Sequence, residues 1–416
     1  MGSWPDSKSA YRFISNPKVT PEKILQPHID ATQSRIHGQK IILAVQDTTD
    51  LNYTHHPCVK GLGTIGSSPK LRGMHVHTTM AFTPERVPLG LIAQQTWIRP
   101  VEEYGKKVTR ISRPIEEKES YKWIMSLNAT EAVQEKYPDT LLVNVGDREA
   151  DIYDLFKLAS KYKCELLVRA SWNRRVEHEE NYLWPCMEAK PVAATLEMNV
   201  PIKKSKKLRE ATVEIRFANI TIRPPKLREK EEKSIEITAV YLNEPNPPEG
   251  TKPLSWMLLT TLSVANDRES LTIIGYYSAR WGIETFHRVL KSGCKIEKRQ
   301  LQTAERLRSC LVLDSIVAWR ILLLTMLGRQ TPDLPCDVIF EEYEWKALYC
   351  YVHKTIEPPD KPPSISEAVQ LVARVGGFLG RKSDGLPGTM VLWRGLQQLS
   401  TISFAWFSFG PGGKSP

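Results

Sequence analysis

Two short apolar runs that each lead into an aspartate most constrain the fold of this chain. Residues 41–45 (IILAV) are followed after one residue by Asp47, and residues 141–145 (LLVNV) are followed after one residue by Asp147. A short apolar run is typical of a strand that is buried on both faces of an α/β sheet. Because ligands of open α/β sheets bind beyond the carboxyl ends of the strands, we expect both aspartates to lie at a functional site.

A third acid stands in a segment rich in phosphate-binding groups. Tyr277, Arg280, Glu284 and Lys291 recur at intervals that place them on one stripe of a single helix, within an arc of roughly 60°. His287 shares this stripe. A lone carboxylate among cations suits an acid that holds a divalent metal beside cations that hold a nucleic-acid backbone. The alternative is a solubility device, because such stripes are also common on solvated helices.

Taken together, the three acids favour a metal-dependent site. Asp47, Asp147 and Glu284 could converge on two divalent cations that bind the attacking and leaving oxygens of a phosphodiester. Each aspartate taken alone could equally be a helix cap or a turn residue. Their order along the chain, together with the basic stripe, favours phosphoryl transfer.

The motifs around these acids resemble those of a known family. The segments QDTT, GDREADIYDL and YYSARWGIE-x6-K are similar to the three acidic signatures and the Y-R-E-K box of bacterial insertion-sequence cut-and-paste DDE transposases. The resemblance extends from about Ala10 to about Phe407. It implies an RNase H-like mixed α/β sheet flanked by helices, and a triad, Asp47, Asp147 and Glu284, that binds two Mg²⁺ or Mn²⁺ ions.

The resemblance also implies contacts with DNA. Tyr277, Arg280 and Lys291 would hold the transposon end, and Trp256 would stack where a base is flipped out during hairpin formation. The further candidate contacts are Arg169, His287 and Arg288. The sequence departs from the family pattern at Gly282 and Thr285, where larger or acidic residues are usual.

The implied activity is DNA transposition by 3′-end nicking, hairpin formation and opening, and strand transfer. The implied partners are double-stranded DNA, both transposon ends and target, and a second copy of the chain in the DNA complex. Only nine residues precede Ala10, so we expect no N-terminal end-binding segment and mainly salt-sensitive phosphate contacts. Two alternatives stay open: a transposase-derived DNA-binding protein that acts as an inhibitor, and a stand-alone RNase H-like nuclease.

Composition predicts a soluble, intracellular protein, and the resemblance implies the bacterial cytoplasm, in association with the nucleoid. The formal net charge of +10 suits an anionic partner. The charge alone does not distinguish a nucleic acid from an acidic membrane surface as the partner. We identify neither a run of 18 uncharged apolar residues nor a signal peptide. Seven cysteines without a CxxC pair are expected to be reduced thiols.

The pattern along the chain predicts an interrupted core with the order β-β-β-α-β-α-β, followed by a β-rich insertion before the third acid and a helical C-terminal part. Basic charge gathers in residues 203–230 and 276–308. A capping box is expected at Ser364. The predicted parts are an N-terminal arm or linker (1–36), the core's first part (37–172), the insertion (173–254), the core's second part (255–356), a helical dimerisation part (364–409) and a disordered tail (410–416).

Overall fold

The strands form one mixed sheet. The structure is a computed structural model of the 416-residue chain and describes residues 4–103, 105, 113–201, 208–381 and 383–410. Its strands are β1 (Ile41–Asn52), β2 (Gly63–Thr64), β3 (Arg72–Phe82), β4 (Pro88–Trp97), β5 (Leu141–Gly146), β6 (Glu165–Arg169), β7 (Ala194–Pro201), β8 (Leu208–Ile222), β9 (Ile235–Asn243) and β10 (Ser255–Thr260). Across the sheet their order is β2-β3-β1-β5-β6-β10-β9-β8-β7, and β4 also pairs with β3.

The half of the sheet from β4 to β6 has the RNase H-like arrangement. β3 runs antiparallel to both β1 and β4, whereas β5 runs parallel to both β1 and β6. Helix α4 (Tyr121–Lys136) connects β4 to β5, and α5 (Tyr153–Ala159) connects β5 to β6. The predicted order β-β-β-α-β-α-β is therefore confirmed, and so is the predicted mixed α/β fold class.

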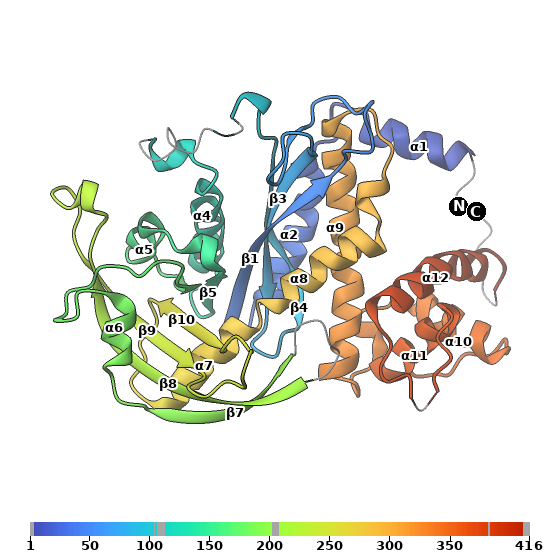
Figure 1. Ribbon diagram of the computed structural model, residues 1–416. Helices are drawn as coiled ribbons and strands as arrows, with labels where there is room; N and C mark the ends of the chain where they lie inside the picture. Colours follow the sequence, from blue (N-terminus) through green and yellow to red (C-terminus); the bar gives the residue numbers. More distant parts are fainter. Residues whose placement is uncertain (1–3, 104, 106–112, 202–207, 382, 411–416) are drawn as a thin grey trace.

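Helices flank this half of the sheet, as Figure 1 shows. Helices α2 and α9 pack against β4, and α4 and α5 pack against β5 and β6, respectively. Besides α4 and α5, the α-helices of the described residues are α1 (Trp4–Ile14), α2 (Pro21–Ile36), α6 (Leu183–Glu188), α7 (Asp267–Ser278), α8 (Trp281–Arg288), α9 (Ala304–Gln330), α10 (Glu342–His353), α11 (Ile365–Val375) and α12 (Thr389–Phe409).

The N-terminal segment differs from the predicted arm or linker. Helix α2 buries Leu25, His28 and Ile36, and it contacts β4 and α9. The Nε2 atom of His28 accepts a hydrogen bond of 3.1 Å from the backbone amide of Leu91 in β4. Residues 21–36 are thus part of the packed core. The sequence did not indicate this burial, because most residues of α2 are polar and its apolar stripe consists of only a few residues.

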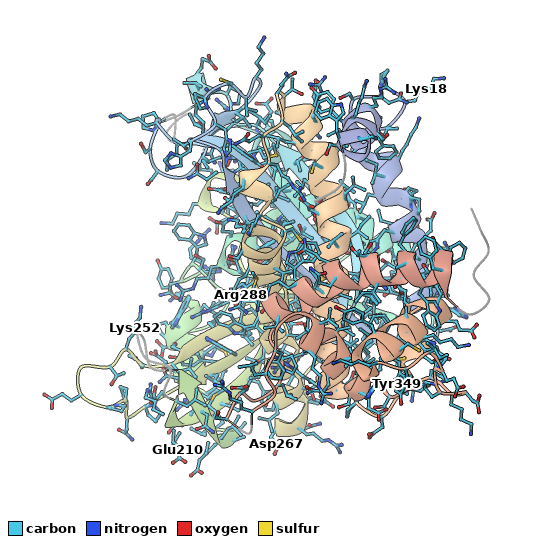
Figure 2. All side chains as sticks on the ribbon, turned by 90° about the vertical axis from the view of Figure 1, so that its right-hand side faces the viewer. Lys18, Glu210, Lys252, Asp267, Arg288 and Tyr349 are labelled. Atoms are coloured by element: carbon cyan, nitrogen blue, oxygen red, sulfur yellow. The ribbon has the colours of Figure 1, made fainter. Side chains whose placement is uncertain are left out.

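The β-rich insertion extends the central sheet. Strand β10 pairs antiparallel with both β6 and β9, so β7, β8 and β9 continue the sheet without a break. In Figure 2, Lys252 and Glu210 lie at the edge of the molecule that these strands form, whereas Tyr349 lies among the C-terminal helices.

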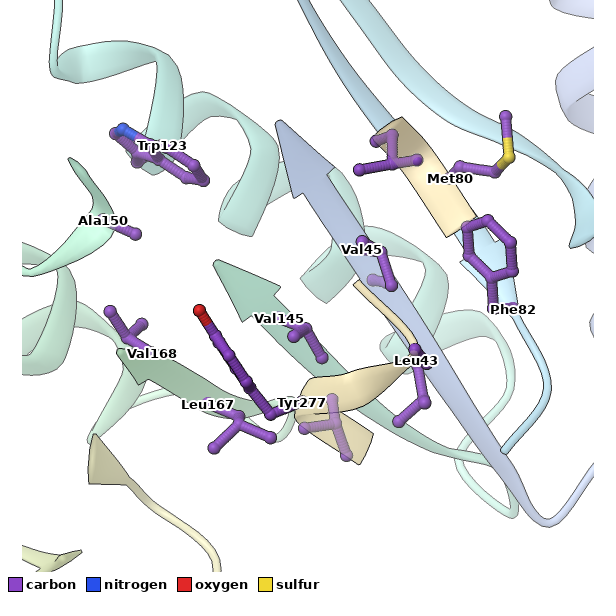
Figure 3. Close-up of a cluster of buried hydrophobic side chains, with 14 of the residues drawn as sticks. Leu43, Val45, Met80, Phe82, Trp123, Val145, Ala150, Leu167, Val168 and Tyr277 are labelled. Atoms are coloured by element: carbon purple, nitrogen blue, oxygen red, sulfur yellow. The ribbon is translucent and has the colours of Figure 1, made fainter. Parts of the chain in front are cut away.

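The largest buried side chains gather around β1, β3 and β5. Figure 3 shows Val45, Val145 and Phe82 in this cluster, with Tyr277 of α7 beside Leu167. Each labelled side chain in this group is at most 4% exposed. Burial on both faces is the physical reason why residues 41–45 of β1 and 141–145 of β5 are almost entirely apolar.

Helix α9 joins this core to the C-terminal helices. It begins after Thr303, whose side chain accepts a hydrogen bond from the Arg306 amide. Among the described residues it is the one helix long and apolar enough to cross a membrane, but most of its apolar stretch is buried in the protein. Helix α11 begins with the predicted capping box of Ser364 and Glu367. A second apolar cluster, which includes Trp345, joins α10, α11 and α12.

Candidate active site

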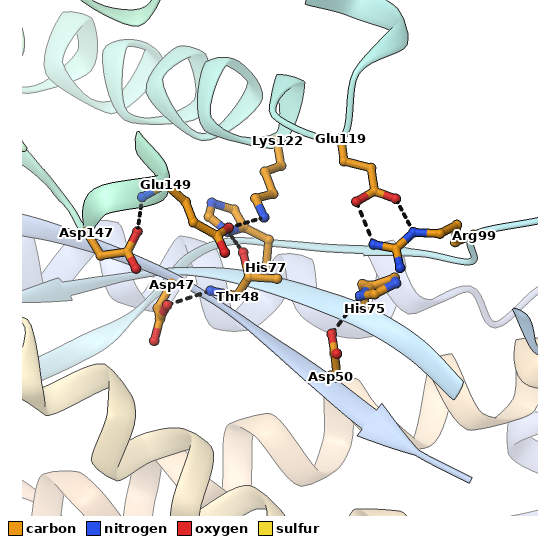
Figure 4. Close-up of polar contacts among 10 residues, drawn as sticks. All are labelled: Asp47, Thr48, Asp50, His75, His77, Arg99, Glu119, Lys122, Asp147 and Glu149. Carbon is orange, nitrogen blue, oxygen red and sulfur yellow. Dashed lines mark hydrogen bonds and ion pairs between the residues drawn. The ribbon is translucent and has the colours of Figure 1, made fainter. Parts of the chain in front are cut away.

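Asp47 and Asp147 lie in register on neighbouring parallel strands. The pairing of β1 with β5 ends at Val45 and Val145, and each aspartate lies two residues beyond this pair. Asp47 is not at the end of its own strand, as the sequence suggested, because β1 continues to Asn52 along β3. The parallel partner β5 ends here instead, which leaves the two carboxylates side by side (Figure 4).

Backbone amides hold both carboxylates. Asp47 Oδ1 accepts a hydrogen bond of 2.9 Å from the amide of Thr48. Asp147 Oδ1 accepts one of 2.8 Å from the amide of Glu149, in the short 3-10 turn that follows β5. The Thr48 hydroxyl lies 2.9 Å from Nδ1 of the buried His77. The aspartates are thus fixed before any ligand binds.

Glu284 is linked to Asp47 through Arg280. The Nη2 atom of Arg280 donates a hydrogen bond of 2.6 Å to Glu284 Oε1, and its Nη1 atom lies 3.9 Å from Asp47 Oδ2. The Arg280 and Asp47 side chains are 12% and 17% exposed, so little water screens their contact, whereas the Glu284 side chain is 39% exposed. One guanidinium therefore interacts with two of the three predicted acids and partly balances their negative charge.

The electrostatics of the two aspartates reflect their crowding. Burial raises the pKa of Asp47 to about 6, and the nearby Asp147 carboxylate adds to this increase while Arg280 opposes it. Burial also raises the pKa of Asp147, against the hydrogen bond from the Glu149 amide. Glu284 makes a smaller contribution to the raised pKa of Asp47, so both other acids lie within electrostatic reach of Asp47.

The carboxylates suit a hard divalent cation, but they are not yet arranged as ligands. Oxygen donors of this kind are what Mg²⁺ and Mn²⁺ prefer. Within the described part of the chain, no three His, Cys, Asp or Glu side chains are positioned together to hold a metal ion. Arg280 lies between Asp47 and Glu284 and supplies the positive charge there.

The segment that carries Glu284 is not one continuous α-helix, in contrast to our prediction. Helix α7 ends at Ser278, α8 begins at Trp281, and residues 289–293 form a π-helical turn. Between them the amides of Arg280 and Gly282 bond to carbonyls three residues earlier, which tightens the turn. The stripe is therefore divided: Tyr277 lies in α7, Glu284 in α8 and Lys291 in the π turn.

Gly282 explains how α8 approaches the sheet so closely. A Cβ atom at this position would lie 2.6 Å from a ring carbon of Phe82 in β3. A larger residue would push α8 away from β3, and with it Glu284. The departure from the family pattern at Gly282 is thus matched by the packing of this chain.

The predicted DNA-contacting residues Tyr277, Trp256 and Arg169 lie together. The rings of Trp256 and Tyr277 meet edge to face with centroids 5.2 Å apart. Tyr277 is 4% exposed, whereas Trp256 is half-buried and lines an open cavity of about 930 Å³. Arg169 and Arg148 line the same cavity, and Arg169 Nη2 donates a hydrogen bond of 2.8 Å to the Ser255 carbonyl.

Of the three remaining candidates, two are accessible. Arg288 is exposed and Lys291 is half-buried. His287 is 6% exposed, and its Nδ1 lies 3.8 Å from Asp47 Oδ2. Burial, with a smaller effect of Lys291, lowers the pKa of His287 to about 3, so the ring is neutral. A buried neutral ring does not fit the predicted phosphate contact, and His287 belongs with the packing around Asp47.

One pair near the site was not identified from the sequence. The Nζ atom of Lys122 in α4 lies 3.0 Å from the carboxylate of Glu149 and 5.4 Å from the ring centroid of Trp97. The Lys122 side chain is 10% exposed. Glu149 stood in a conspicuous acidic motif, but nothing in the sequence indicated which cation it pairs with.

The basic stretch of the insertion is partly neutralised. Residues 203–207 lie outside the described residues. Arg209 pairs with Glu244, Arg216 with Glu214, and Arg228 with Asp154. These described cations stabilise the insertion, and they carry less free charge than the sequence count suggested.

Comparison with known proteins gives two matching family models and one similar solved structure. The family model for the transposase DDE domain matches residues 126–318, and the model for the transposase Tn5 dimerisation domain matches residues 316–406. A cryo-EM structure of a piggyBac transposase synaptic complex with hairpin DNA is similar over 96% of this chain and 65% of that chain, with 9% identity and a TM-score of 0.34.

The two matches adjoin within α9 and together span residues 126–406. The dimerisation match begins well before residue 364, where the sequence placed that part, and it includes the second half of α9 and all of α10. On the strength of the two matched models, the chain belongs to the DDE-type transposases.

Proposed function

We propose that this chain catalyses cut-and-paste DNA transposition, with Asp47, Asp147 and Glu284 as the ligands of two Mg²⁺ or Mn²⁺ ions. The observation that carries the proposal is the arrangement of the acids. Asp47 and Asp147 lie in register beyond the end of β5, and Arg280 connects Asp47 with Glu284. Such a group of three neighbouring carboxylates fits in-line phosphoryl transfer.

The protein's own groups would position the reacting phosphodiester. The amides of Thr48 and Glu149 fix the two aspartates, and burial keeps bulk water from screening their charge. When bound, the divalent cations would activate the attacking oxygen and stabilise the charge that develops on the phosphate. Arg280, Arg288 and Lys291 supply cations for the flanking phosphates.

A single site could serve every step of the reaction. Water would cleave one strand at the transposon end, and the freed 3′-hydroxyl would attack the opposite strand to form a hairpin. A second water would open the hairpin, and the 3′-hydroxyl would then join target DNA. Each step is an in-line displacement at phosphorus, so no covalent bond to the protein is required.

The cavity beside Trp256 would receive an extruded base during hairpin formation. Trp256 offers a half-buried aromatic face, and the Tyr277 ring packs against it edge to face. Arg169 and Arg148 on the cavity wall would bind the adjacent phosphates. Stacking of one base on an aromatic ring contributes about 1 to 3 kcal/mol, enough to offset part of the cost of unpairing.

A second copy of the chain would pair through the C-terminal helices. The matched dimerisation domain covers α12 as far as residue 406. Phe404 of this helix is 71% exposed, and Phe407, just beyond the match, is 53% exposed. These rings line a groove of about 460 Å³ together with Tyr343 and Leu396. Exposed aromatic rings on a helix mark a protein interface. We propose that the pair holds two DNA ends in the bacterial cytoplasm, in association with the nucleoid.

The test is incubation of the purified chain with duplexes that carry the element's own ends, in Mg²⁺ or in EDTA. We expect nicked, hairpin and strand-joined products in Mg²⁺ alone. Asp147→Ala should abolish nicking and leave DNA affinity unchanged or higher, because it removes a negative charge near the DNA. The matched control is Asp360→Asn, which alters an exposed acid in the loop before α11.

The alternatives predict other products. A stand-alone nuclease would cleave and never join strands. A transposase-derived DNA-binding protein would bind the duplex without cutting it in any metal, and such a result would refute the proposed catalysis.

A further inference from the structure

We propose that Arg280 is an internal counter-cation that keeps the metal site closed until a DNA phosphate draws its guanidinium away. This inference rests on the proposed function, because it concerns how the same carboxylates acquire their metal. It predicts that metal and DNA bind cooperatively, with Arg280 as the group that couples them.

The first observation is the position of the guanidinium. Arg280 Nη2 is 2.6 Å from Glu284 Oε1, and Nη1 is 3.9 Å from Asp47 Oδ2. A divalent cation would need oxygens from these same two carboxylates. Because like charges at such separations repel strongly where water is scarce, the guanidinium and the metal compete for one place.

The second observation is an unpaired donor. The Nε atom of Arg280 is buried and has no hydrogen-bond partner among the described residues. An arginine presents its donors as a planar fork that matches the oxygens of a phosphate. In the closed arrangement Arg280 binds carboxylates through its Nη atoms alone, so a phosphate would satisfy a donor that the protein leaves unsatisfied.

The third observation is a path for the side chain. The guanidinium lies 5.3 Å from the ring centroid of Trp281 and 6.0 Å from that of Tyr277. Trp281 is 57% exposed at the start of α8, whereas Tyr277 is buried. A guanidinium that moves along the Trp281 ring keeps a cation–π contact while it turns from the acids toward the surface.

The consequence is a reciprocal coupling between the two ligands. If DNA removes Arg280 from the acids, DNA must raise the affinity for metal, and metal must raise the affinity for DNA by the same factor. A free protein would then hold metal weakly, so cutting would begin only after DNA is in place.

The coupling can be measured without activity, by EPR titration of Mn²⁺ against wild type, Arg280→Gln and Arg280→Lys. In the absence of DNA we expect Arg280→Gln to bind Mn²⁺ roughly tenfold more tightly than wild type, a typical coupling between sites. Arg280→Lys keeps the charge and should stay as weak as wild type. Arg374→Gln removes an exposed arginine of α11 and is the matched control that should not change.

A random-sequence duplex, with a DNA-alone blank, supplies the second measurement. The duplex should tighten Mn²⁺ binding to wild type and have little effect on Arg280→Gln. Fluorescence anisotropy should show that Mn²⁺ tightens DNA binding to wild type by the same factor by which DNA tightens Mn²⁺ binding. Equal Mn²⁺ affinities for wild type and Arg280→Gln, or no effect of DNA on wild type, would overturn the counter-cation role.

Asp147→Asn separates this inference from the proposed function. If Asp147→Asn loses Mn²⁺ binding while Arg280→Gln binds like wild type, the acids hold metal and the counter-cation role alone fails. If Asp147→Asn binds Mn²⁺ like wild type, the metal site itself is wrong. Circular dichroism confirms that each variant is folded.

Discussion

Lys122 Nζ lies 3.0 Å from the carboxylate of Glu149, and the amide of the same Glu149 donates a hydrogen bond of 2.8 Å to Asp147. A lysine of α4 therefore holds the turn that orients a proposed metal ligand. Loss of a group that orients a metal ligand commonly lowers metal affinity or activity substantially.

Lys122→Met should lower the nicking rate roughly 10- to 100-fold with little change in DNA affinity. Burial raises the pKa of Asp147 and the Lys122 ammonium opposes this increase. Loss of the ammonium should therefore raise that pKa further and move the acidic limb of the pH–rate profile to higher pH. Lys122→Arg should restore most of the rate. An unchanged pH profile in Lys122→Met would contradict the positioning role.

Asp47→Asn should stabilise the metal-free protein at pH 7.5. The folded pKa of Asp47 is about 6, against an ordinary value of 3.8. When folding raises the pKa of a carboxyl, the folded protein loses stability as the pH rises from the unfolded-state pKa to the folded-state pKa. The substitution should therefore add at most about 3 kcal/mol at pH 7.5, and nothing below pH 4. Thermal unfolding at both pH values in EDTA checks this, and a lower Tm for Asp47→Asn at pH 7.5 would refute it.

Gly282→Ala should destabilise the protein by about 1–3 kcal/mol, because the added Cβ overlaps the Phe82 ring. Gly275→Ala is the matched control, since a Cβ there meets nothing within 4 Å. It should stabilise α7 by about 0.5–1 kcal/mol. Urea denaturation of the two variants should give shifts of opposite sign, and shifts of the same sign would count against the close approach of α8.

Asp151→Ala should unfold the protein more readily than Asp147→Ala. The Asp151 side chain is 0% exposed and accepts hydrogen bonds from the amides of Ser171 and Trp172 and from Arg174 Nε. Its removal leaves the Nε atom of Arg174 and the two amides without a carboxylate acceptor, at a cost of about 3–5 kcal/mol, although Arg174 Nη2 still donates to the carbonyl of residue 151. Asp154→Ala, which breaks a more exposed pair with Arg228, should cost less. Equal Tm values for Asp151→Ala and Asp147→Ala would show that Asp151 has no such structural role.

Trp256→Ala should slow hairpin formation and leave the first nick at the wild-type rate. The lost stacking of about 1 to 3 kcal/mol corresponds to a decrease of roughly 5- to 150-fold in the hairpin step. Trp256→Phe keeps an aromatic face and should retain most of the rate. Gel analysis of pre-nicked duplexes isolates this step, and a wild-type rate of hairpin formation by Trp256→Ala would exclude the stacking role.

The sequence was most informative where local pattern and burial coincide. The apolar runs before Asp47 and Asp147 identified β1 and β5, since strands covered on both faces carry few polar residues. The continuation of β1 to Asn52 was not apparent, because its later residues Asp47 to Asp50 are polar and only their pairing with β3 makes them a strand.

Features that depend on distant contacts were not predictable from one chain. The close approach of α8 to β3 depends on how Gly282 meets Phe82, 200 residues earlier in the sequence. Asp151 and Asp147 look alike within GDREAD, and only burial against Arg174 distinguishes the structural acid from the accessible one. His287 shared the basic stripe, but its position beneath Asp47 became evident only in three dimensions.

If two copies cut two DNA ends as proposed, helix α9 has a mechanical consequence for the paired cuts. Its 27 residues span about 40 Å, and the catalytic and dimerisation matches meet inside it at residues 316–318. A continuous, largely buried rod has no joint at which the two parts could swing. Whatever angle two copies adopt at their C-terminal helices would therefore be transmitted directly to their catalytic centres, and α9 would act as a ruler that sets the spacing of the two breaks.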